Sequence, residues 1–177
     1  MKEGIIEFNN NKYKYKFFDT YHLIDLIKNN HKFISIYENN IKKYRQNPNF
    51  EIFNLIKEFI YYRPDSKVYY FISYKNNEIV SMARLYYYKE KNYGYINMVY
   101  TNEKYRGQGI CTKTIKFLIN ISKKNIKKYE LEVDSDNLSA IKCYENNNFQ
   151  FVKKIEYIQN INGIKKIKYY NLMKLII

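Results

Sequence analysis

The N-terminal part of the chain switches from a strand pattern to a helix pattern. Residues Lys12–Phe17 alternate polar and apolar side chains, which is typical of a half-buried strand, and Ile5–Phe8 could pair with it across an asparagine turn. Asp19 or Thr20 then stands where a helix N-cap is expected. Apolar side chains at steps of three and four predict three consecutive helices after this cap, and prolines follow the second and third.

The pattern after Pro64 is that of a mixed sheet with helices. Apolar runs with short polar turns between them predict an antiparallel meander of three strands, and helices and strands then alternate. The expected elements are strands Val68–Tyr74, Ile79–Tyr88 and Tyr93–Thr101, helix Ile110–Ser122, strand Tyr129–Val133, helix Leu138–Asn146, and strands Phe149–Tyr157 and Lys166–Leu175. This order predicts an α/β fold with a central, mostly antiparallel sheet of about six to seven strands and helices on both faces.

The composition is that of a globular protein with a strongly basic surface. Hydrophobic residues make up 46% of the chain, and the formal net charge is +14. The lysines are scattered, and Ile, Lys, Asn and Tyr share AT-rich codons, so we attribute the charge mainly to a solvated surface shaped by codon bias. We therefore expect no nucleic-acid partner, although an acidic partner stays open.

Cysteine use and hydropathy indicate a cytoplasmic protein. Cys111 and Cys143 are far apart and lack Cys-x-x-Cys spacing, so we expect neither a disulfide scaffold nor a zinc site. Met1–Phe8 has no signal-peptide core, and no apolar run approaches the roughly 20 residues that span a bilayer. We expect no membrane partner.

The stretch Val99–Thr112 has the pattern of an anion-binding turn. A strand enters it, a helix leaves it, and Arg106 precedes Gly107 and Gly109 between them. Backbone N–H groups in the first turn of a helix lack intrahelical acceptors, and the helix dipole adds positive potential there. Glycine lets the backbone approach an anion without a Cβ in the way. The stretch therefore predicts a site for a phosphate or pyrophosphate group.

Two other phosphate-binding motifs fit this turn less well. A mononucleotide P-loop requires a Gly-x-x-x-x-Gly-Lys-Ser/Thr string, which the chain lacks. A dinucleotide turn matches Gly107–Thr112 as Gly-x-Gly-x-x-Thr, with Glu132 near the position of a ribose ligand. Its third glycine is missing, however, and the polar spacer Asn102–Arg106 separates the strand from the glycines.

Two motifs together resemble the GCN5-related N-acetyltransferase (GNAT) superfamily. The segment Arg106–Cys111 is similar to that family's Arg/Gln-x-x-Gly-x-Gly/Ala signature. Leu131, Glu132, Val133, Asn137, Ala140, Tyr144 and Phe149 resemble the family's second motif, Asn-x-x-Ala followed by Tyr-Glu-x-x-Gly-Phe. Cys111 replaces the small residue that ends the first motif, and Asn148 replaces the glycine before Phe149. Both changes are mild, because cysteine is small and asparagine tolerates a left-handed helix cap.

The resemblance implies a binding site for acetyl-coenzyme A. Backbone groups of Val99 and Thr101 would hold the pantetheine arm, Asn137 would bond it, and Tyr144 would protonate the leaving thiolate as a general acid. The pyrophosphate would be held by the backbone amides of Arg106, Gly107, Gln108, Gly109, Ile110, Cys111 and Thr112. The plainer interpretation of Tyr144 is a core residue on one helix stripe with Leu138 and Ile141.

The attacking amine needs a base, for which Glu132 is the first candidate. Its position twelve residues before Tyr144 resembles the Glu and Tyr pair of bacterial ribosomal-protein N-terminal acetyltransferases. As a base, its carboxyl pKa should rise toward about 6–7. The alternative is that Glu132 is only a polar strand residue, in which case Asp134, Glu103 or a water chain could take the proton.

The resemblance implies one acetyltransferase domain over residues 1–177, with acceptor-side helices in 1–64 and the sheet and cofactor core in 65–177. The expected activity is transfer of an acetyl group from acetyl-coenzyme A directly to a primary amine. The alternative is a catalytically silent module that binds coenzyme A and docks an acidic partner. An edge strand at the C-terminus could also support a homodimer.

Overall fold

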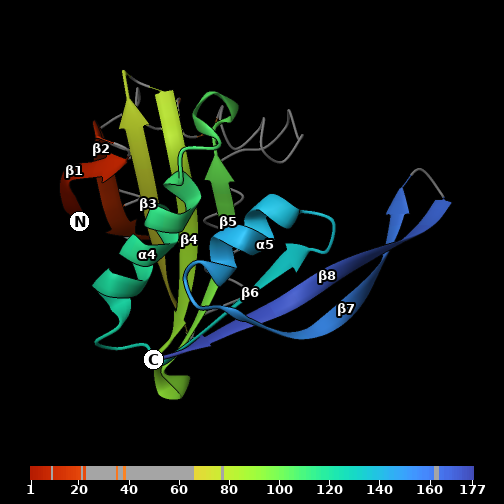
Figure 1. Ribbon diagram of the computed structural model, residues 1–177. Helices are drawn as coiled ribbons and strands as arrows, with labels where there is room; N and C mark the ends of the chain where they lie inside the picture. The colour runs from red at the N-terminus through yellow and green to blue at the C-terminus, as the bar shows by residue number, and fades with distance from the viewer. Residues whose placement is uncertain are drawn as a thin grey trace.

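A sheet of eight strands runs through the described part of the chain, residues 1–8, 10–20, 22, 35, 38, 66–76, 78–161 and 164–177 of the computed structural model (Figure 1). The strands lie in the order β1-β2-β3-β4-β5-β6-β8-β7, and every neighbouring pair except β5 and β6 is antiparallel. The elements are β1 (Lys2–Phe8), β2 (Asn11–Asp19), β3 (Ser66–Lys75), β4 (Glu78–Tyr88), β5 (Tyr93–Thr101), α4 (Ile110–Ser122), β6 (Lys128–Asp134), α5 (Leu138–Glu145), β7 (Gln150–Ile161) and β8 (Ile164–Ile176).

The α/β fold with a mostly antiparallel sheet is confirmed. The sheet has more strands than the six or seven expected, since β1 pairs with β2 along its whole length. Asp19 is confirmed as a cap, because its Oδ1 accepts a hydrogen bond of 3.1 Å from the His22 backbone N–H. The three helices expected between this cap and Pro64 fall almost entirely outside the described residues.

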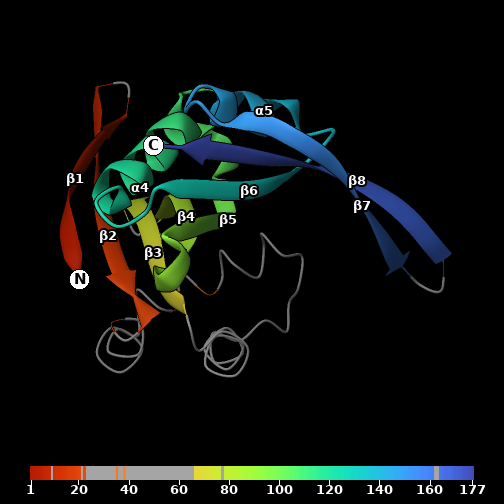
Figure 2. The ribbon, with the colours of Figure 1, turned by 90° about the horizontal axis from the view of Figure 1, so that it is seen from below.

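The described helices α4 and α5 lie on one side of the sheet (Figure 2). The buried residues of α4 recur at steps of three and four, which turns one apolar stripe toward the sheet. That stripe packs on alternate residues of β4 and β6, including Leu85, Leu131 and Val133, and on Tyr144 of α5. In the described part of the chain, no helix is both long and apolar enough to cross a membrane.

The last two strands form a long hairpin that projects from the rest of the sheet (Figures 1 and 2). Only the base of β8 pairs with β6, through Tyr170 to Ile176, while β7 forms the edge of the sheet. Apolar side chains such as Ile158 and Ile167 are therefore exposed near the tip.

Candidate functional site

The strands β5 and β6 separate near the middle of the sheet. They form only three parallel pairs, from Tyr93 opposite Lys128 to Tyr95 opposite Glu130. Beyond Tyr95, β5 continues to Thr101 and β6 to Asp134 with no ladder between them. Two strand edges with no ladder between them therefore face a gap, in which an extended ligand with amide groups could bond like an additional strand.

A β-bulge deforms β5 beside this gap. Met82 pairs with Tyr100 and Arg84 pairs with Asn97, so Met98 and Val99 together lie opposite Ala83. Met98 has a φ of 50°, which is unusual for a residue other than glycine. The bulge shifts the register of β5 at the position where Val99 and Thr101 were expected to hold a ligand.

The glycine turn after β5 presents a row of free backbone donors. Gly107 and Gly109 have φ values of 76° and 70°, and Gly109 is the N-cap of α4. Among the described residues, the backbone amides of positions 107–112 have no backbone acceptor, and the first intrahelical bond runs from Lys113 N–H to Gly109 O. Six adjacent donors at a helix N-terminus have the arrangement that an anion-binding turn requires.

The approach to the turn is fixed by hydrogen bonds. The side chain of Asn102 donates to Ile79 O at 3.1 Å and accepts from the Lys104 backbone N–H at 3.2 Å. Lys104 also pairs with Glu78 at 2.9 Å, and this contact lowers the pKa of the Glu78 carboxyl. The Arg106 Nε donates to Thr101 O at 3.3 Å, so the guanidinium stays beside the turn and exposed.

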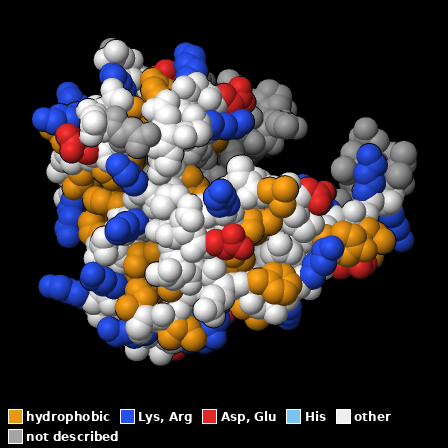
Figure 3. All heavy atoms as spheres, viewed as in Figure 1, with side chains coloured by type: hydrophobic (Ala, Val, Ile, Leu, Met, Phe, Trp, Pro, Cys, Tyr) orange, Lys and Arg blue, Asp and Glu red, His pale blue; other side chains and the backbone are white. Residues whose placement is uncertain are grey.

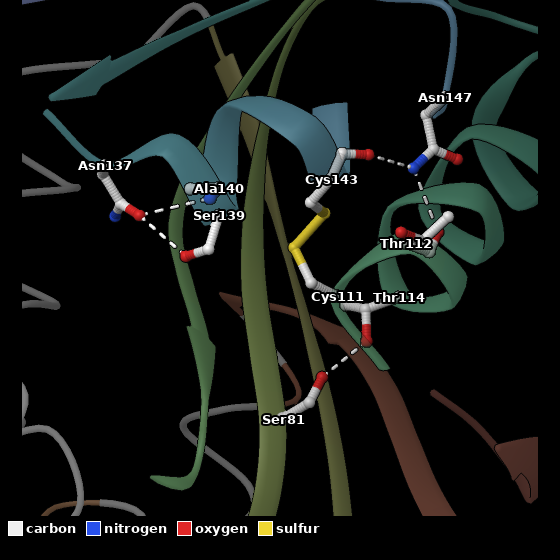
Figure 4. Close-up of a disulfide and its surroundings, with 9 residues drawn as sticks. All are labelled: Ser81, Cys111, Thr112, Thr114, Asn137, Ser139, Ala140, Cys143 and Asn147. Atoms are coloured by element: carbon white, nitrogen blue, oxygen red, sulfur yellow. Dashed lines mark hydrogen bonds between the residues drawn. A yellow bond between two sulfur atoms is a disulfide. The ribbon is translucent and has the colours of Figure 1, made fainter. Parts of the chain in front are cut away.

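Asn137 begins α5 as its N-cap. Its side-chain oxygen accepts hydrogen bonds from the Ala140 backbone N–H at 3.1 Å and from the Ser139 hydroxyl at 3.0 Å. The amide nitrogen points away from the helix and remains exposed (Figure 4). The Asn-x-x-Ala spacing therefore serves a helix cap, and the NH2 end of the same side chain is available to a ligand.

Tyr144 lies near the C-terminal end of α5, and its side chain packs in the core between the helices and the sheet. Its side chain is 5% exposed and its ring lies 6.1 Å from that of Phe149. The helix ends with hydrogen bonds from Phe149 N–H to Tyr144 O and from Asn148 N–H to Glu145 O. Asn148 has a φ of 64°, so it adopts the left-handed conformation expected of the residue that replaces glycine.

Glu132 does not lie beside Tyr144. Its neighbours Leu131 and Val133 pack under the helices with Tyr144, so Glu132 points to the opposite face of β6. There it accepts a hydrogen bond of 2.9 Å from the Tyr157 hydroxyl, which raises the pKa of Tyr157. The alternative base Asp134 pairs with Lys168 at 2.6 Å, and this contact lowers the pKa of its carboxyl.

Cys111 and Cys143 form a disulfide, so the expectation that their spacing excludes one is wrong (Figure 4). The two residues are separated by 32 positions in sequence, yet their Cα atoms lie 6.0 Å apart. Packing of α4 on α5 brings them together, which no local spacing could reveal. The bond ties the first turn of α4, in the anion cradle, to the residue before Tyr144.

Hydrogen bonds at two places, which sequence reasoning missed, reinforce the packing of α4 against α5 and against β4. Asn147 donates from its side chain to Thr112 O at 3.1 Å and to Cys143 O at 2.9 Å (Figure 4). The hydroxyls of Ser81 and Thr114 hydrogen-bond at 2.5 Å between β4 and α4, and both side chains are fully buried. Asn147 lies in the run Asn146–Asn148, which AT-rich codons alone would explain. Only its burial in the structure distinguishes it from the exposed asparagines beside it.

Reduction of the disulfide is expected to lower the free energy of unfolding by about 3–4 kcal/mol, because the bond closes a loop of 32 residues in the unfolded chain. Urea denaturation with and without dithiothreitol measures this difference. The double variant Cys111→Ser/Cys143→Ala is the control, since dithiothreitol should not change its stability. Equal stability of the wild-type protein in both conditions would contradict the expectation.

Comparison with known proteins places this geometry in a family. The model of the acetyltransferase (GNAT) family matches residues 21–149, whereas a search of the curated proteins finds no match. A spermidine N-acetyltransferase chimera from Vibrio cholerae superposes with a TM-score of 0.65 at 16% identity, covering 81% of this chain and 88% of that one. The ribosomal-protein α-N-acetyltransferase RimL in complex with coenzyme A gives 0.63 at 16% identity, covering 98% of both chains.

A ribosomal-protein-alanine N-acetyltransferase from Brucella melitensis also superposes, with a TM-score of 0.61 at 13% identity, covering 92% of this chain and 99% of that one. At these identities the structures share the fold. The family model covers most of the chain, from the first expected helix through the glycine turn to Phe149. The chain therefore belongs to the acetyltransferase (GNAT) family.

Proposed function

We propose that the protein binds acetyl-coenzyme A in the gap between β5 and β6 and transfers the acetyl group to a primary amine. The single observation that carries the proposal is the gap itself, which ends at the row of free amides of the glycine turn. Related folds contain the same ligand: an acetyltransferase from Elizabethkingia anophelis was solved with acetyl-coenzyme A bound, and RimL with coenzyme A.

The proposed roles follow from where each residue lies. Backbone groups of Val99 and Thr101 line the deformed edge of β5 and would bond the pantetheine amides. The amides of Gly107, Gln108, Gly109, Ile110, Cys111 and Thr112 would surround the pyrophosphate, whereas the Arg106 amide donates to Glu103 O at 3.2 Å, which leaves its exposed guanidinium as the group that would approach the anion. The exposed NH2 group of Asn137 would donate to the pantetheine arm.

Tyr144 is the proposed acid. Acetyl-coenzyme A supplies an activated thioester, and the departing thiolate needs a proton as the amide forms. A phenol has a reference pKa near 10, so at neutral pH Tyr144 carries the proton that it would donate. Its side chain as a whole is buried, which limits the access of water to it.

The attacking amine must be neutral before it reacts. At pH 7 the loss of a proton costs about 1 kcal/mol for an α-amine and about 4–5 kcal/mol for a lysine side chain. Glu132 is the proposed base, acting through water because it lies across the strand from Tyr144. Within the domain, residues 1–64 would contribute to acceptor binding and residues 65–177 would hold the cofactor.

An assay of thiol release from acetyl-coenzyme A over a panel of amines tests the proposal. Release that depends on the amine, with an acetylated product identified by mass spectrometry, would support it. Binding of coenzyme A without turnover on any amine would instead favour a silent module that docks an acidic partner.

The scattered Lys and Arg side chains form no single patch on the face in Figure 3, which favours the enzyme over a module that docks an acidic partner. A cytoplasmic location, where acetyl-coenzyme A is present, remains part of this proposal, but the Cys111–Cys143 disulfide removes the cysteine argument for it.

We also propose that the protein forms a homodimer through the open edge of β7. Most of the large exposed apolar side chains lie on the projecting hairpin, including Phe151, Ile158 and Ile167. If two β7 strands pair antiparallel about Ile155, Lys154 of each copy faces Glu156 of the partner subunit. The edge is thus complementary in charge to itself, which favours a second copy as its occupant.

Glu156→Lys is expected to weaken the dimer by about tenfold or more, because it places like charges opposite each other twice. Light scattering coupled to gel filtration measures the mass against the 21.8 kDa chain. The charge-swapped variant Lys154→Glu/Glu156→Lys should restore the dimer. A monomeric wild-type protein, or a dimer that tolerates Glu156→Lys alone, would contradict this arrangement.

A further inference from the structure

Arg84 is a buried cation in the middle of a central strand. Its side chain is 5% exposed, and its neighbours Ala83 and Leu85 pack in the core beneath α4 and α5. By strand alternation, Arg84 therefore points to the other face of the sheet. A buried guanidinium is costly unless other groups compensate its charge, so its partners indicate what the site is for.

The described residues do not neutralise this charge. The Arg84 Nε donates to Asn97 Oδ1 at 2.9 Å, and the guanidinium lies 4.8 Å from the centre of the Tyr86 ring. Both partners are uncharged, and none of the ion pairs in the described part of the chain includes Arg84. The other buried cation, Lys16, pairs with Glu3 at 2.5 Å.

Two unpartnered hydroxyls lie in the same region. Tyr70 is directly opposite Arg84 in the β3–β4 ladder and is 2% exposed. Its hydroxyl and that of the nearby Thr20 are the two buried side-chain polar atoms in the described residues that make no hydrogen bond of normal length, although the closeness of Thr20 and Arg84 offsets part of the effect of burial on the pKa of Tyr70. Burial raises the pKa of Tyr70 to about 12, so its hydroxyl keeps its proton and can donate it in a hydrogen bond to an acceptor. A buried hydroxyl without a partner is rare and requires an explanation.

A small cavity, with room for about one water-sized group, lies beside these groups and the bulge of β5. Tyr70, Arg84, Met82 and Met98 contribute to its lining. Met98 is the bulge residue that precedes Val99, where the pantetheine arm is proposed to bind. A carboxylate that enters this cavity would therefore contact Tyr70 and Arg84, next to the segment of β5 where the pantetheine arm is proposed to bind.

We propose that this cavity binds the carboxylate of an acceptor that also carries the reactive amine, that is, an amino acid or a similarly small amino carboxylate. This inference rests on the proposed function and names its substrate class. The guanidinium of Arg84 supplies the charge, and the Tyr70 and Thr20 hydroxyls supply neutral donors to the carboxylate oxygens. The net charge of +14 would also attract an anionic acceptor.

The test compares each amino acid with its carboxamide in the thiol-release assay. Because the carboxamide removes the negative charge and lowers the pKa of the neighbouring amine, intrinsic reactivity favours the carboxamide. We expect the reverse, with kcat/KM at least about tenfold higher for the preferred amino acid, since a hydrogen bond to a charged group contributes about 1.5–3 kcal/mol. Equal or better turnover of carboxamides would overturn the proposal.

Tyr70→Phe and Arg84→Met separate binding from folding. Tyr70→Phe removes a hydroxyl that makes no hydrogen bond of normal length, so a purely structural role predicts equal or higher thermal stability and unchanged kinetics. The proposal predicts that both variants raise KM for the amino acid about tenfold or more, while KM for acetyl-coenzyme A stays unchanged. Tyr69→Phe on the neighbouring position of β3 is the matched control. A wild-type KM for the amino acid in Tyr70→Phe would refute the proposal.

A binding measurement distinguishes failure of the site from failure of the proposed function. Thermal stabilisation of the wild-type protein is recorded with amino acids and with their carboxamides, in the presence of coenzyme A. Stabilisation by an amino acid alone, without any turnover, would support the carboxylate site and refute acetyl transfer. Turnover of amines without any advantage of the carboxylate would refute the site and support acetyl transfer.

Discussion

The double variant Gly107→Ala/Gly109→Ala is expected to weaken coenzyme A binding by about 100-fold. Both glycines adopt left-handed backbone conformations, at φ values of 76° and 70°, which cost an L-residue about 1–2 kcal/mol each. A Cβ at either position would meet no protein atom within 4 Å, so packing does not require glycine there. The requirement comes from the backbone conformation and from the space that an approaching phosphate needs.

Isothermal calorimetry with coenzyme A measures this loss. Asn92→Ala is the matched control, because Asn92 also has a left-handed conformation, with a φ of 46°, in the turn before β5. Both variants should lose some stability, but only the glycine variant should lose affinity. Wild-type affinity in the glycine variant would show that the turn does not bind the cofactor.

Tyr144→Phe is expected to lower kcat by about 100-fold or more while leaving the affinity for acetyl-coenzyme A unchanged. The change removes the proton that the leaving thiolate would accept, and positioned acids typically contribute factors of about 10²–10⁴. The ring and its contact with Phe149 remain, so the fold should persist. Steady-state thiol release at saturating substrates gives the ratio.

Tyr129→Phe controls for the loss of a buried tyrosine hydroxyl. Tyr129 is fully buried, and its hydroxyl hydrogen-bonds to the Ser122 hydroxyl at 2.8 Å, at the end of α4 remote from the glycine turn. This variant should lose stability and keep its kcat. If Tyr144→Phe and Tyr129→Phe behave alike, Tyr144 is a core residue and not the acid.

Much of the fold could be predicted from local patterns, because most elements carry their own periodicity. The helix over Ile110–Ser122 and the strand over Tyr93–Thr101 have the expected bounds, and the helix that starts at Leu138 ends one residue earlier than expected. The strands β7 and β8 are longer than expected. Their additional pairs run from Ile158 opposite Ile167 to Ile161 opposite Ile164, and Ile158 and Ile167 are both exposed.

The geometry of the site depends on contacts between distant segments, which the sequence does not encode locally. The strands β5 and β6 share only three pairs before they separate, and no residue type in the sequence indicates where the pairing ends. The disulfide between Cys111 and Cys143 follows from helix packing. Arg84 did leave a signal, since it is the one charged residue inside the apolar run Ile79–Tyr88, but only the structure shows that it is buried.

A structure of the protein in complex with coenzyme A tests the central claim most directly. The proposal predicts that the pyrophosphate oxygens lie about 2.7–3.2 Å from backbone nitrogens of the turn Gly107–Thr112. It also predicts that the pantetheine arm occupies the gap between β5 and β6, with the thiol within hydrogen-bond reach of the Tyr144 hydroxyl. A pyrophosphate bound elsewhere, or a thiol remote from Tyr144, would contradict it.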